Sequence, residues 1–152
     1  KNESSAARTG DSPVLQAVDV NVGMDGSWFD PDSAGQGFFI DVHEDSSGDG
    51  FIFLAWFTYG SDTQSGQRWL TAQGAFNGSE TTIDIFESTG GSFDEATEVE
   101  TVPVGSLTIR FDDCATASLS YSLPDEGLGN DLELERVMPA SGDLCEALTG
   151  MD

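Results

Sequence analysis

Basic side chains are almost missing from this chain. Its 152 residues include 28 acidic side chains but only five lysines and arginines, so the formal net charge is −23. Proteins bind nucleic acid and anionic lipid through Lys and Arg, which displace counterions, so we expect no nucleic-acid partner. An acidic surface of this kind is typical of salty media, where ions screen the self-repulsion, and it predicts a marine or halophilic source. Arg68, Arg110 and Arg136 are expected to pair with this acidic coat.

Cysteine is scarce as well, which limits the covalent cross-links to one. Cys114 follows a predicted strand and Cys145 lies in the tail after the last one, so a disulfide between them would fasten the tail to the domain. Such a bond indicates an oxidising compartment. The alternatives are two free buried thiols or a metal pair, although two cysteines and the distant His43 would make a poor zinc site.

Long apolar runs are missing too. No stretch is apolar and long enough to span a membrane as a helix, and we expect no membrane insertion. The chain begins with Lys1 rather than Met, which favours a mature or trimmed product. These features predict a secreted, periplasmic or cell-surface protein. Residues 1–25 are polar and are expected to be a flexible leader with a short strand near residues 18–22, followed by one domain over residues 26–152.

Short apolar segments alternate with turns rich in Gly, Asp and Ser, a pattern that indicates hairpins. The expected strands are residues 27–29, 37–43, 51–59, 67–76, 81–87, 105–111, 117–123 and 131–137. Residues 88–104 contain Gly90, Gly91 and Pro103 and are interpreted as a loop with some extended structure. The sequence therefore predicts a single all-β antiparallel meander of about eight strands, closed into a barrel, with a β-sandwich as the alternative. No substantial helix is expected, apart from one short turn over residues 141–148 that Ser141 caps and Gly150 ends.

The strand at residues 51–59 is apolar on both faces, which predicts a central or covered position. Apolar walls with a few hydrogen-bonding groups are typical of small-ligand and sugar sites. A mixed aromatic and polar face of this kind is predicted across the second to fourth strands, and its candidate ligand-binding residues are Trp69, Trp56, Phe39, Asp41, His43, Thr58, Thr71 and Gln73. The alternative is that these rings fill the core. The sequence favours the core for Trp56 and makes Trp69 the better ligand candidate.

Signals of catalysis are weak, and no catalytic residue is predicted. His43 is the single histidine, no Gly-x-Ser-x-Gly motif is present, and among 28 acids no carboxylate pair stands out. Calcium is the one ion that the loops could suit, because Asp45 and Asp49 lie in one turn and Asp30 and Asp32 in another. Neither turn has the twelve-residue calcium-loop pattern, and turn chemistry alone explains both. No cofactor is expected, and Ca²⁺ stays the open alternative.

Several short motifs recur in a fixed order along residues 26–145. They comprise a Gly-x-Trp-Phe-Asp-Pro opening, an Ala-Gly-x-Gly turn, a Trp-Phe-Thr-Tyr segment, a Trp-containing strand and a Val-Gly-x-x-Thr-x-x-Phe strand; their positions are Gly26, Trp28, Phe29, Asp30, Pro31, Gly35, Gly37, Trp56, Phe57, Thr58, Tyr59, Trp69, Val104, Gly105 and Phe111. Together they resemble a β module of secreted or exported proteobacterial proteins that has no settled activity. The resemblance implies a β fold and export. The Gly-x-Trp opening and the strand count also resemble avidin and lipocalin barrels, which bind small ligands.

These observations predict a secreted non-catalytic binding or accessory module. Its ligand would be a glycan or a small hydrophobic molecule, and its partner could equally be a protein. A purely structural or interaction domain is the first alternative. A carboxylate-dependent hydrolase is the second, and the lack of a nucleophile–base pair in the sequence disfavours it.

Overall fold

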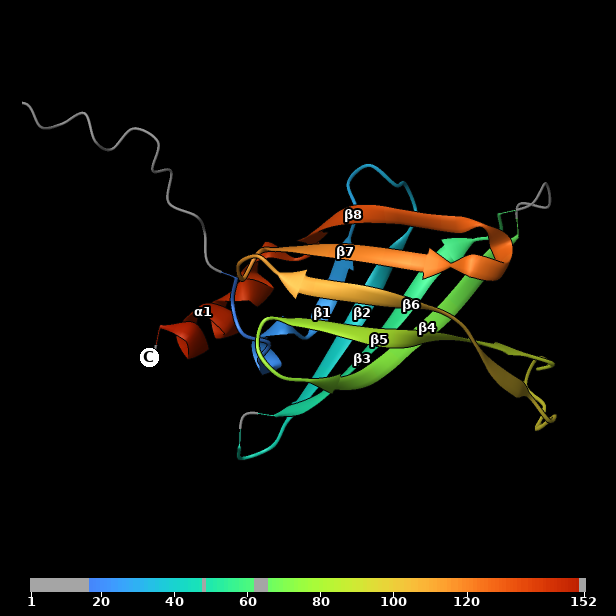
Figure 1. The fold of residues 1–152 in the computed structure, drawn as a ribbon, viewed down its shortest axis with the longest axis horizontal. Helices are drawn as coiled ribbons and strands as arrows, with labels where there is room; N and C mark the ends of the chain where they lie inside the picture. Colours follow the sequence, from blue (N-terminus) through green and yellow to red (C-terminus); the bar gives the residue numbers. More distant parts are fainter. Residues whose placement is uncertain (1–16, 48, 62–65, 151–152) are drawn as a thin grey trace, which may run out of the picture.

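The computed structural model describes residues 17–47, 49–61 and 66–150. Within these residues the chain forms eight strands and one short α-helix, with three single turns of 3-10 helix between them (Figure 1). The strands are β1 (Gly26–Phe29), β2 (Gly37–Glu44), β3 (Gly50–Tyr59), β4 (Gln67–Phe76), β5 (Glu80–Thr89), β6 (Glu100–Phe111), β7 (Thr116–Leu123) and β8 (Leu128–Arg136). The α-helix is α1 (Asp143–Thr149), and the 3-10 turns are η2 (Val22–Met24), η3 (Pro124–Glu126) and η4 (Pro139–Gly142).

The eight strands form one closed antiparallel barrel in sequence order. Each strand pairs with the next, and β1 completes the circle by pairing with β8, where Trp28 lies opposite Arg136. The predicted meander and its closure into a barrel are therefore confirmed, and the sandwich alternative is ruled out. Closure also leaves no free sheet edge around most of the circumference.

The β5–β6 hairpin is longer than predicted. Part of the segment interpreted as a loop belongs to these strands, which extend to Thr89 and back from Glu100 and project beyond the barrel (Figure 1). Pro103 is tolerated within β6 for two reasons. The register shifts between Ile85 and Phe86 beside it, and β6 pairs with β7 only from Ser106 onward, so no second ladder needs the missing amide there.

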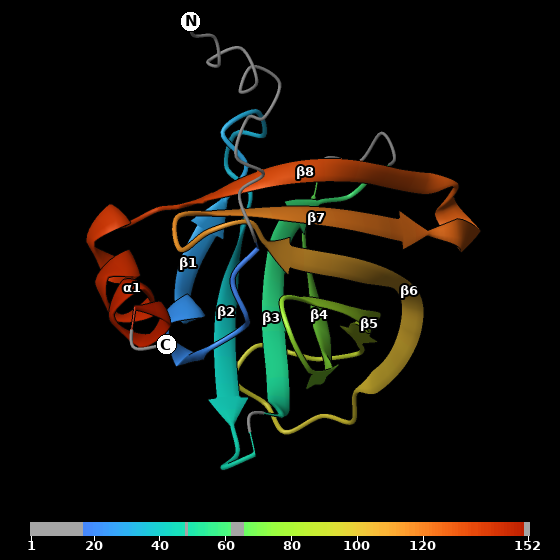
Figure 2. The same ribbon diagram turned by 60° about the vertical axis from the view of Figure 1, so that its left-hand side comes forward.

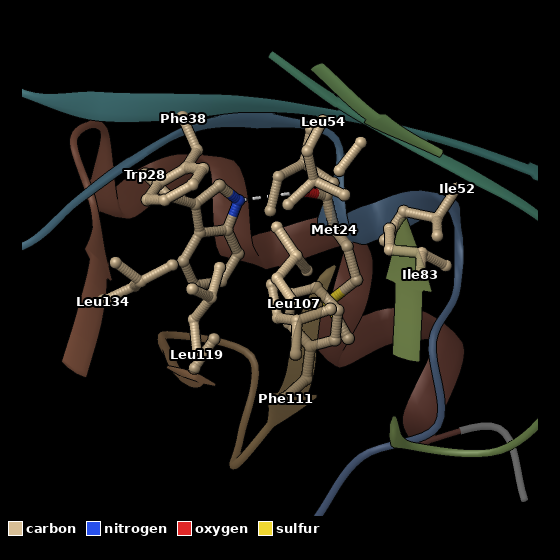
Figure 3. Packing of buried hydrophobic residues seen from close by; sticks show 14 of the residues in the cluster. Met24, Trp28, Phe38, Ile52, Leu54, Ile83, Leu107, Phe111, Leu119 and Leu134 are labelled. Carbon is tan, nitrogen blue, oxygen red and sulfur yellow. Dashed lines mark hydrogen bonds between the residues drawn. The ribbon is translucent and has the colours of Figure 1, made fainter. Parts of the chain in front are cut away.

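Side chains fill the middle of the barrel, as expected for eight strands. Figure 3 shows rings and branched aliphatic side chains from all sides of the barrel converging on Trp28 and Phe111. These two rings meet edge to face with centroids 5.5 Å apart, and the Trp28 indole donates a hydrogen bond of 3.0 Å to the Met24 carbonyl. The inward rows of β2 and β3 are Phe38, Ile40 and Val42, and Ile52, Leu54 and Trp56.

Residues 17–25 differ from the predicted flexible leader, and no strand forms near residues 18–22. The Val18 and Val20 amides donate hydrogen bonds of 2.9 Å to the carbonyls of Phe111 and Gly78, and Val20 and Met24 are buried. The segment packs because its apolar side chains cover one end of the barrel. Residues 1–16 of the predicted leader lie outside the described residues.

Helix α1 lies against the same end of the barrel (Figure 2). It begins at Asp143 after η4 with Gly142 at the N-cap position, one residue after the predicted cap at Ser141, and Gly150 ends it as predicted. The predicted disulfide is confirmed, because Cys114 and Cys145 are bonded with their Cα atoms 5.7 Å apart. A side chain at Gly23 would meet the Cys145 backbone at 2.4 Å, so a glycine is needed where η2 crosses α1.

Arg136 has a different role from the predicted one. Its side chain lies inside the barrel with the guanidinium carbon 4.5 Å from the centre of a Trp28 ring, an orientation that allows a cation–π interaction. It donates hydrogen bonds to the Gly23 and Cys114 carbonyls at 2.7 and 2.6 Å. Burial lowers its pKa, yet a guanidinium stays charged at any ordinary pH. Arg136 therefore joins the covering segments to the barrel instead of pairing with the acidic coat.

Candidate ligand-binding surface

The outside of the barrel is divided into two chemically different halves. The strands β5–β8 present short hydroxyl and charged side chains outward, mainly Glu80, Thr82, Asp84, Thr108, Arg110, Ser120, Asp131, Glu133 and Glu135. The strands β2–β4 present large exposed rings instead, which are Phe39, Phe51, Phe53, Phe57, Tyr59 and Trp69. We call the outward side of β2–β4 the aromatic face. An exposed apolar patch made of several large side chains is a candidate binding site in a soluble protein.

The aromatic face is almost free of charge. Along β2, β3 and β4, Asp41 is the one acidic side chain that points outward, and His43 is the one titratable base. The chain as a whole carries 28 acids, so the acidic coat stops at the boundary of this face. The remaining outward groups are small or uncharged and include Thr71 and Gln73, whose polar atoms can form hydrogen bonds between the rings.

Register decides which tryptophan belongs to this face. In the β3–β4 ladder Phe57 lies opposite Trp69, whereas Trp56 lies opposite Leu70. Residues directly opposite each other in a ladder point to the same side, so Trp56 and Trp69 point to opposite sides of the sheet. The prediction that they share one face is wrong. The side chain of Trp56 is 7% exposed and belongs to the core, whereas that of Trp69 is 54% exposed.

The predicted site residues therefore fall into two groups. Six lie on the aromatic face, namely Phe39, Asp41, His43, Trp69, Thr71 and Gln73. Trp56 and Thr58 point into the barrel at the end opposite α1, where Trp56 stacks on Phe38 with centroids 5.3 Å apart and meets Tyr121 edge to face at 4.8 Å. The Thr58 hydroxyl hydrogen-bonds the Gln36 side chain at 2.6 Å. The strand β3 was predicted to be central or covered, and it is central, between β2 and β4, with its outward rings uncovered.

A groove of about 420 Å³ lies beside Trp69. Its floor is formed by Phe57 and Tyr59, and its far wall by Gly35 in the β1–β2 loop. Gly35 has φ of +71°, and a side chain there would meet the Tyr59 hydroxyl at 2.6 Å, so a glycine keeps this wall low. The groove is open to solvent and has an indole, a phenol and a phenyl ring on its surface.

Arg68 supports this groove from the inner side of β4. Its guanidinium forms a two-pronged ion pair with Glu87 at 2.9 and 3.0 Å and a second one with Glu126 at 2.7 and 2.8 Å. These hydrogen bonds lower the pKa of Glu126 and raise that of Arg68. The predicted pairing with acids is thus found for Arg68, and Arg110 also lies 3.2 Å from Asp112. Arg68 lines the groove together with Trp69, and its charge is compensated by these two carboxylates.

A second, smaller groove of about 140 Å³ lies on the other side of Phe57. Its outward walls are Phe29, Phe39 and Val137, which come from β1, β2 and the residue after β8. Phe39 and Phe57 meet edge to face with centroids 5.4 Å apart. Gly37 also lines this groove. A side chain there would meet the Trp28 carbonyl at 2.7 Å, so the position needs a glycine. The two grooves share Phe57 as their common wall.

The end of the barrel opposite α1 holds two hollows of about 100 and 190 Å³, both smaller than the groove beside Trp69. Trp56, Thr58 and Tyr121 line both of them. The rings of Trp56 and Tyr121 are packed against each other, and polar side chains such as Gln36 and Asn130 also line the smaller hollow.

The calcium candidates serve as turn residues. The Asp30 carboxylate accepts hydrogen bonds of 2.9 Å from the Asp32 amide and the Ser33 hydroxyl, so its oxygens hold the β1–β2 turn. Asp45 accepts from the amide and hydroxyl of Ser47, and the hydroxyl bond is the main reason why its pKa is lowered. Asp49 is hydrogen-bonded to the Asn77 side chain. Across residues 17–47, 49–61 and 66–150, no three His, Cys, Asp or Glu side chains are grouped to hold a metal.

Four residues of the aromatic face are missing from the predicted site, namely Phe51, Phe53, Phe57 and Tyr59. The sequence does contain a signal for them, because they alternate strictly along β3 and line up with Phe39 and Trp69 in the observed register. The predicted site contains Trp56 and Thr58 instead, which lie on the other side of β3. Among the described residues, no helix is long and apolar enough to cross a membrane. Comparison with protein-family models, curated proteins and solved structures finds no match to this chain.

Proposed function

We propose that this protein is an exported, non-catalytic binding module that holds a neutral glycan on its aromatic face. The observation that carries the proposal is the exposure of six large rings on one side of the barrel, in a region that contains a single outward acid. The middle of the barrel is packed with side chains, so the outside offers the larger surface for a ligand.

The chemistry of the face favours an uncharged ligand. A cationic partner would be drawn to the acidic half of the barrel, where carboxylates are dense, rather than to β2–β4. An anionic ligand would be repelled by the net charge of −23. An uncharged ligand is neither attracted to the acidic half nor repelled by the net charge, and it gains free energy by burying apolar area against the rings.

A glycan fits this face better than a small hydrophobic molecule does. Small hydrophobic ligands bind in enclosed cavities that cover most of their surface. The rings here lie on the outer wall of a barrel, and polar groups such as Thr71 and Gln73 lie among them. A sugar ring has an apolar C–H side that packs on an aromatic ring and hydroxyl groups that need hydrogen-bond partners. The aromatic face offers both kinds of contact.

Export is part of the proposal. The Cys114–Cys145 disulfide is compatible with an oxidising compartment, where such bonds persist. The resemblance of the Gly26–Ser27–Trp28 opening and the motifs after it to exported proteobacterial modules supports the same localisation. A glycan-binding module outside the cell would meet polysaccharide directly.

Native affinity electrophoresis tests the proposal. The protein is run in gels that contain a neutral polysaccharide, in separate gels for a cellulose ether, a xylan, a β-1,3-glucan and a soluble starch, and in gels with the anionic polymer alginate. We expect retardation in at least one neutral gel and none in alginate. Trp69→Ala should abolish the retardation because it removes the most exposed ring beside the larger groove.

The matched control is Phe93→Ala. Phe93 is 98% exposed in the loop between β5 and β6, so its removal also deletes an exposed ring but leaves the aromatic face intact. Its retardation should equal that of the unmodified protein. Free migration in every neutral gel, or equal retardation of both variants, would contradict the proposal.

A further inference from the structure

We infer that the aromatic face binds an extended internal stretch of a polymer, which lies across the strands and occupies a second binding subsite formed by Phe29, Phe39 and Val137. This inference rests on the proposed function and adds to it the shape of the ligand. It concerns the smaller groove, which none of the sequence motifs singled out as a site.

The two grooves adjoin at one shared residue. Phe57 lines both the groove of about 420 Å³ next to Trp69 and the groove of about 140 Å³ next to Phe29. A ligand that packs on Phe57 can therefore extend to either side of it. Gly37 has no side chain to interrupt this path, and its backbone lies between Phe57 and Phe29.

The residues that line the two grooves follow one another across the strands. Trp69 and Phe57 lie opposite each other across β4 and β3, and Gly37 lies opposite Phe57 on β2, so the path crosses the strands instead of following one. Neighbouring strands are about 4.8 Å apart, and from β4 to β1 the path crosses three such spacings, or roughly 14 Å. One sugar ring is too short to contact both ends. A chain of several rings can reach from Trp69 to Phe29.

The second groove is lined mainly by apolar and aromatic side chains. Its outward walls are two phenyl rings and the exposed Val137 side chain, and no acid or base lines it. The first groove is also lined by aromatic rings, and its one charged lining residue, Arg68, is paired with Glu87 and Glu126. One uniform neutral chain can therefore occupy both grooves. Neither groove ends in a closed pocket that would enclose a chain terminus, which favours internal units over chain ends.

The test uses oligosaccharides of increasing length, prepared from whichever neutral polysaccharide retards the unmodified protein, with binding measured by isothermal titration calorimetry. Affinity should rise with chain length and then level off once both grooves are filled. Phe29→Ala and Val137→Asp should leave the affinity for the shortest binding oligomer unchanged. For the long oligomers each should lose roughly threefold to tenfold, the value expected for one aromatic or apolar contact.

Val137→Asp provides a second test of the subsite if Phe29→Ala fails to fold, because Val137 is exposed and its substitution should not disturb the core. Val99→Asp is its matched control, since Val99 is exposed in the loop before β6 and the same charge is added away from the face. Trp69→Ala should weaken the binding of all lengths. Affinity that does not depend on length, or length dependence unaltered in both subsite variants, overturns the second subsite while the proposed function stands. If no polysaccharide binds at all, both fail.

Discussion

The three tryptophans of the chain lie at three different depths. Trp28 is completely buried and hydrogen-bonded at the covered end, Trp56 is packed between Phe38 and Tyr121 at the other end, and Trp69 lies on the outside. Composition alone does not separate them, because all three occur in strand-like segments with similar neighbours. Their different surroundings lead to different expectations for substitution.

Trp56→Ala should destabilise the protein by about 3–5 kcal/mol, because it deletes a buried ring and leaves a cavity between two others. Trp69→Ala should change the free energy of unfolding by less than about 0.5 kcal/mol, since it removes an exposed side chain. Chemical denaturation of each variant, followed by circular dichroism, measures both values. Equal losses of stability in the two variants would show that the assignment of core and surface is mistaken.

Arg136 is predicted to be as important for stability as a core residue. Arg136→Ala removes the contact with Trp28 and leaves the Gly23 and Cys114 carbonyls without their donors, which should cost about 3 kcal/mol or more. Arg136→Lys should recover only part of this loss, because an ammonium cannot reproduce the planar fork of a guanidinium. Thermal melts of both variants provide the measurement, with Arg110→Ala as the exposed-arginine control. A melting temperature for Arg136→Ala that matches this control would contradict the role.

At the scale of elements, the alternation of side chains between the two sides of each strand was predictable. The register between neighbouring strands was not. The two alternating sets of side chains in β2, β3 and β4 follow directly from the period of two, but the period does not say which set of β3 points inward. Whether Trp56 and Trp69 share a side depends on the β3–β4 register, and a shift by one residue exchanges the two faces. Residues 61–66 connect these strands without a sequence signal strong enough to fix the register.

Two further differences from prediction arise from tertiary contacts that the local sequence does not show. Pro103 disfavours a strand locally, but the β6 ladder has a bulge beside it and a free side, so tertiary pairing prevails. The polar residues around Val18 and Val20 conceal that these two side chains complete the cover of the barrel. Cys114 and Cys145, by contrast, had one possible intrachain partner each, and their pairing could be predicted.

Reduction of the disulfide should release α1 from the end of the barrel. The bond joins residues 31 positions apart, for which the chain-entropy model gives a stabilisation of about 3–4 kcal/mol. We expect the melting temperature to fall by roughly 10 °C in dithiothreitol, since each kcal/mol corresponds to about 2–4 °C in a domain of this size. The double variant Cys114→Ser/Cys145→Ser should melt at the same lowered temperature and be insensitive to dithiothreitol. An unchanged melting temperature after complete reduction would contradict the role of the disulfide in holding α1 against the end of the barrel.

At the scale of the whole molecule, charge is distributed as unevenly as aromatic area. Among the described residues of β2–β4, Asp41 is the one outward acid, so the acidic side chains of the other strands and loops lie outside the aromatic face, where like charges repel one another. Concentrating the acids there keeps the protein soluble without charging the proposed binding surface. Repulsion between these acids also predicts that the stability of the fold depends on ions.

Salt should therefore stabilise this protein. Raising NaCl from about 0.01 M to about 1 M shortens the Debye length from about 30 Å to about 3 Å and screens the repulsion. We expect the melting temperature at neutral pH to rise by several degrees over this range. Near the isoelectric point of about 4.1 the same salt series should have much less effect, because the net charge is then close to zero. A salt effect of equal size at both pH values would mean that charge repulsion is not its cause.

The tryptophans also provide the most direct test of where a ligand binds. Each indole N–H gives a separate signal in a ¹H–¹⁵N correlation spectrum, and Trp→Phe variants assign the three signals of Trp28, Trp56 and Trp69. Titration with the glycan that retards the protein in gels should shift the Trp69 signal and leave the other two in place. A shift of Trp56 without a shift of Trp69 would place the ligand in the end of the barrel and contradict the aromatic face as the binding surface.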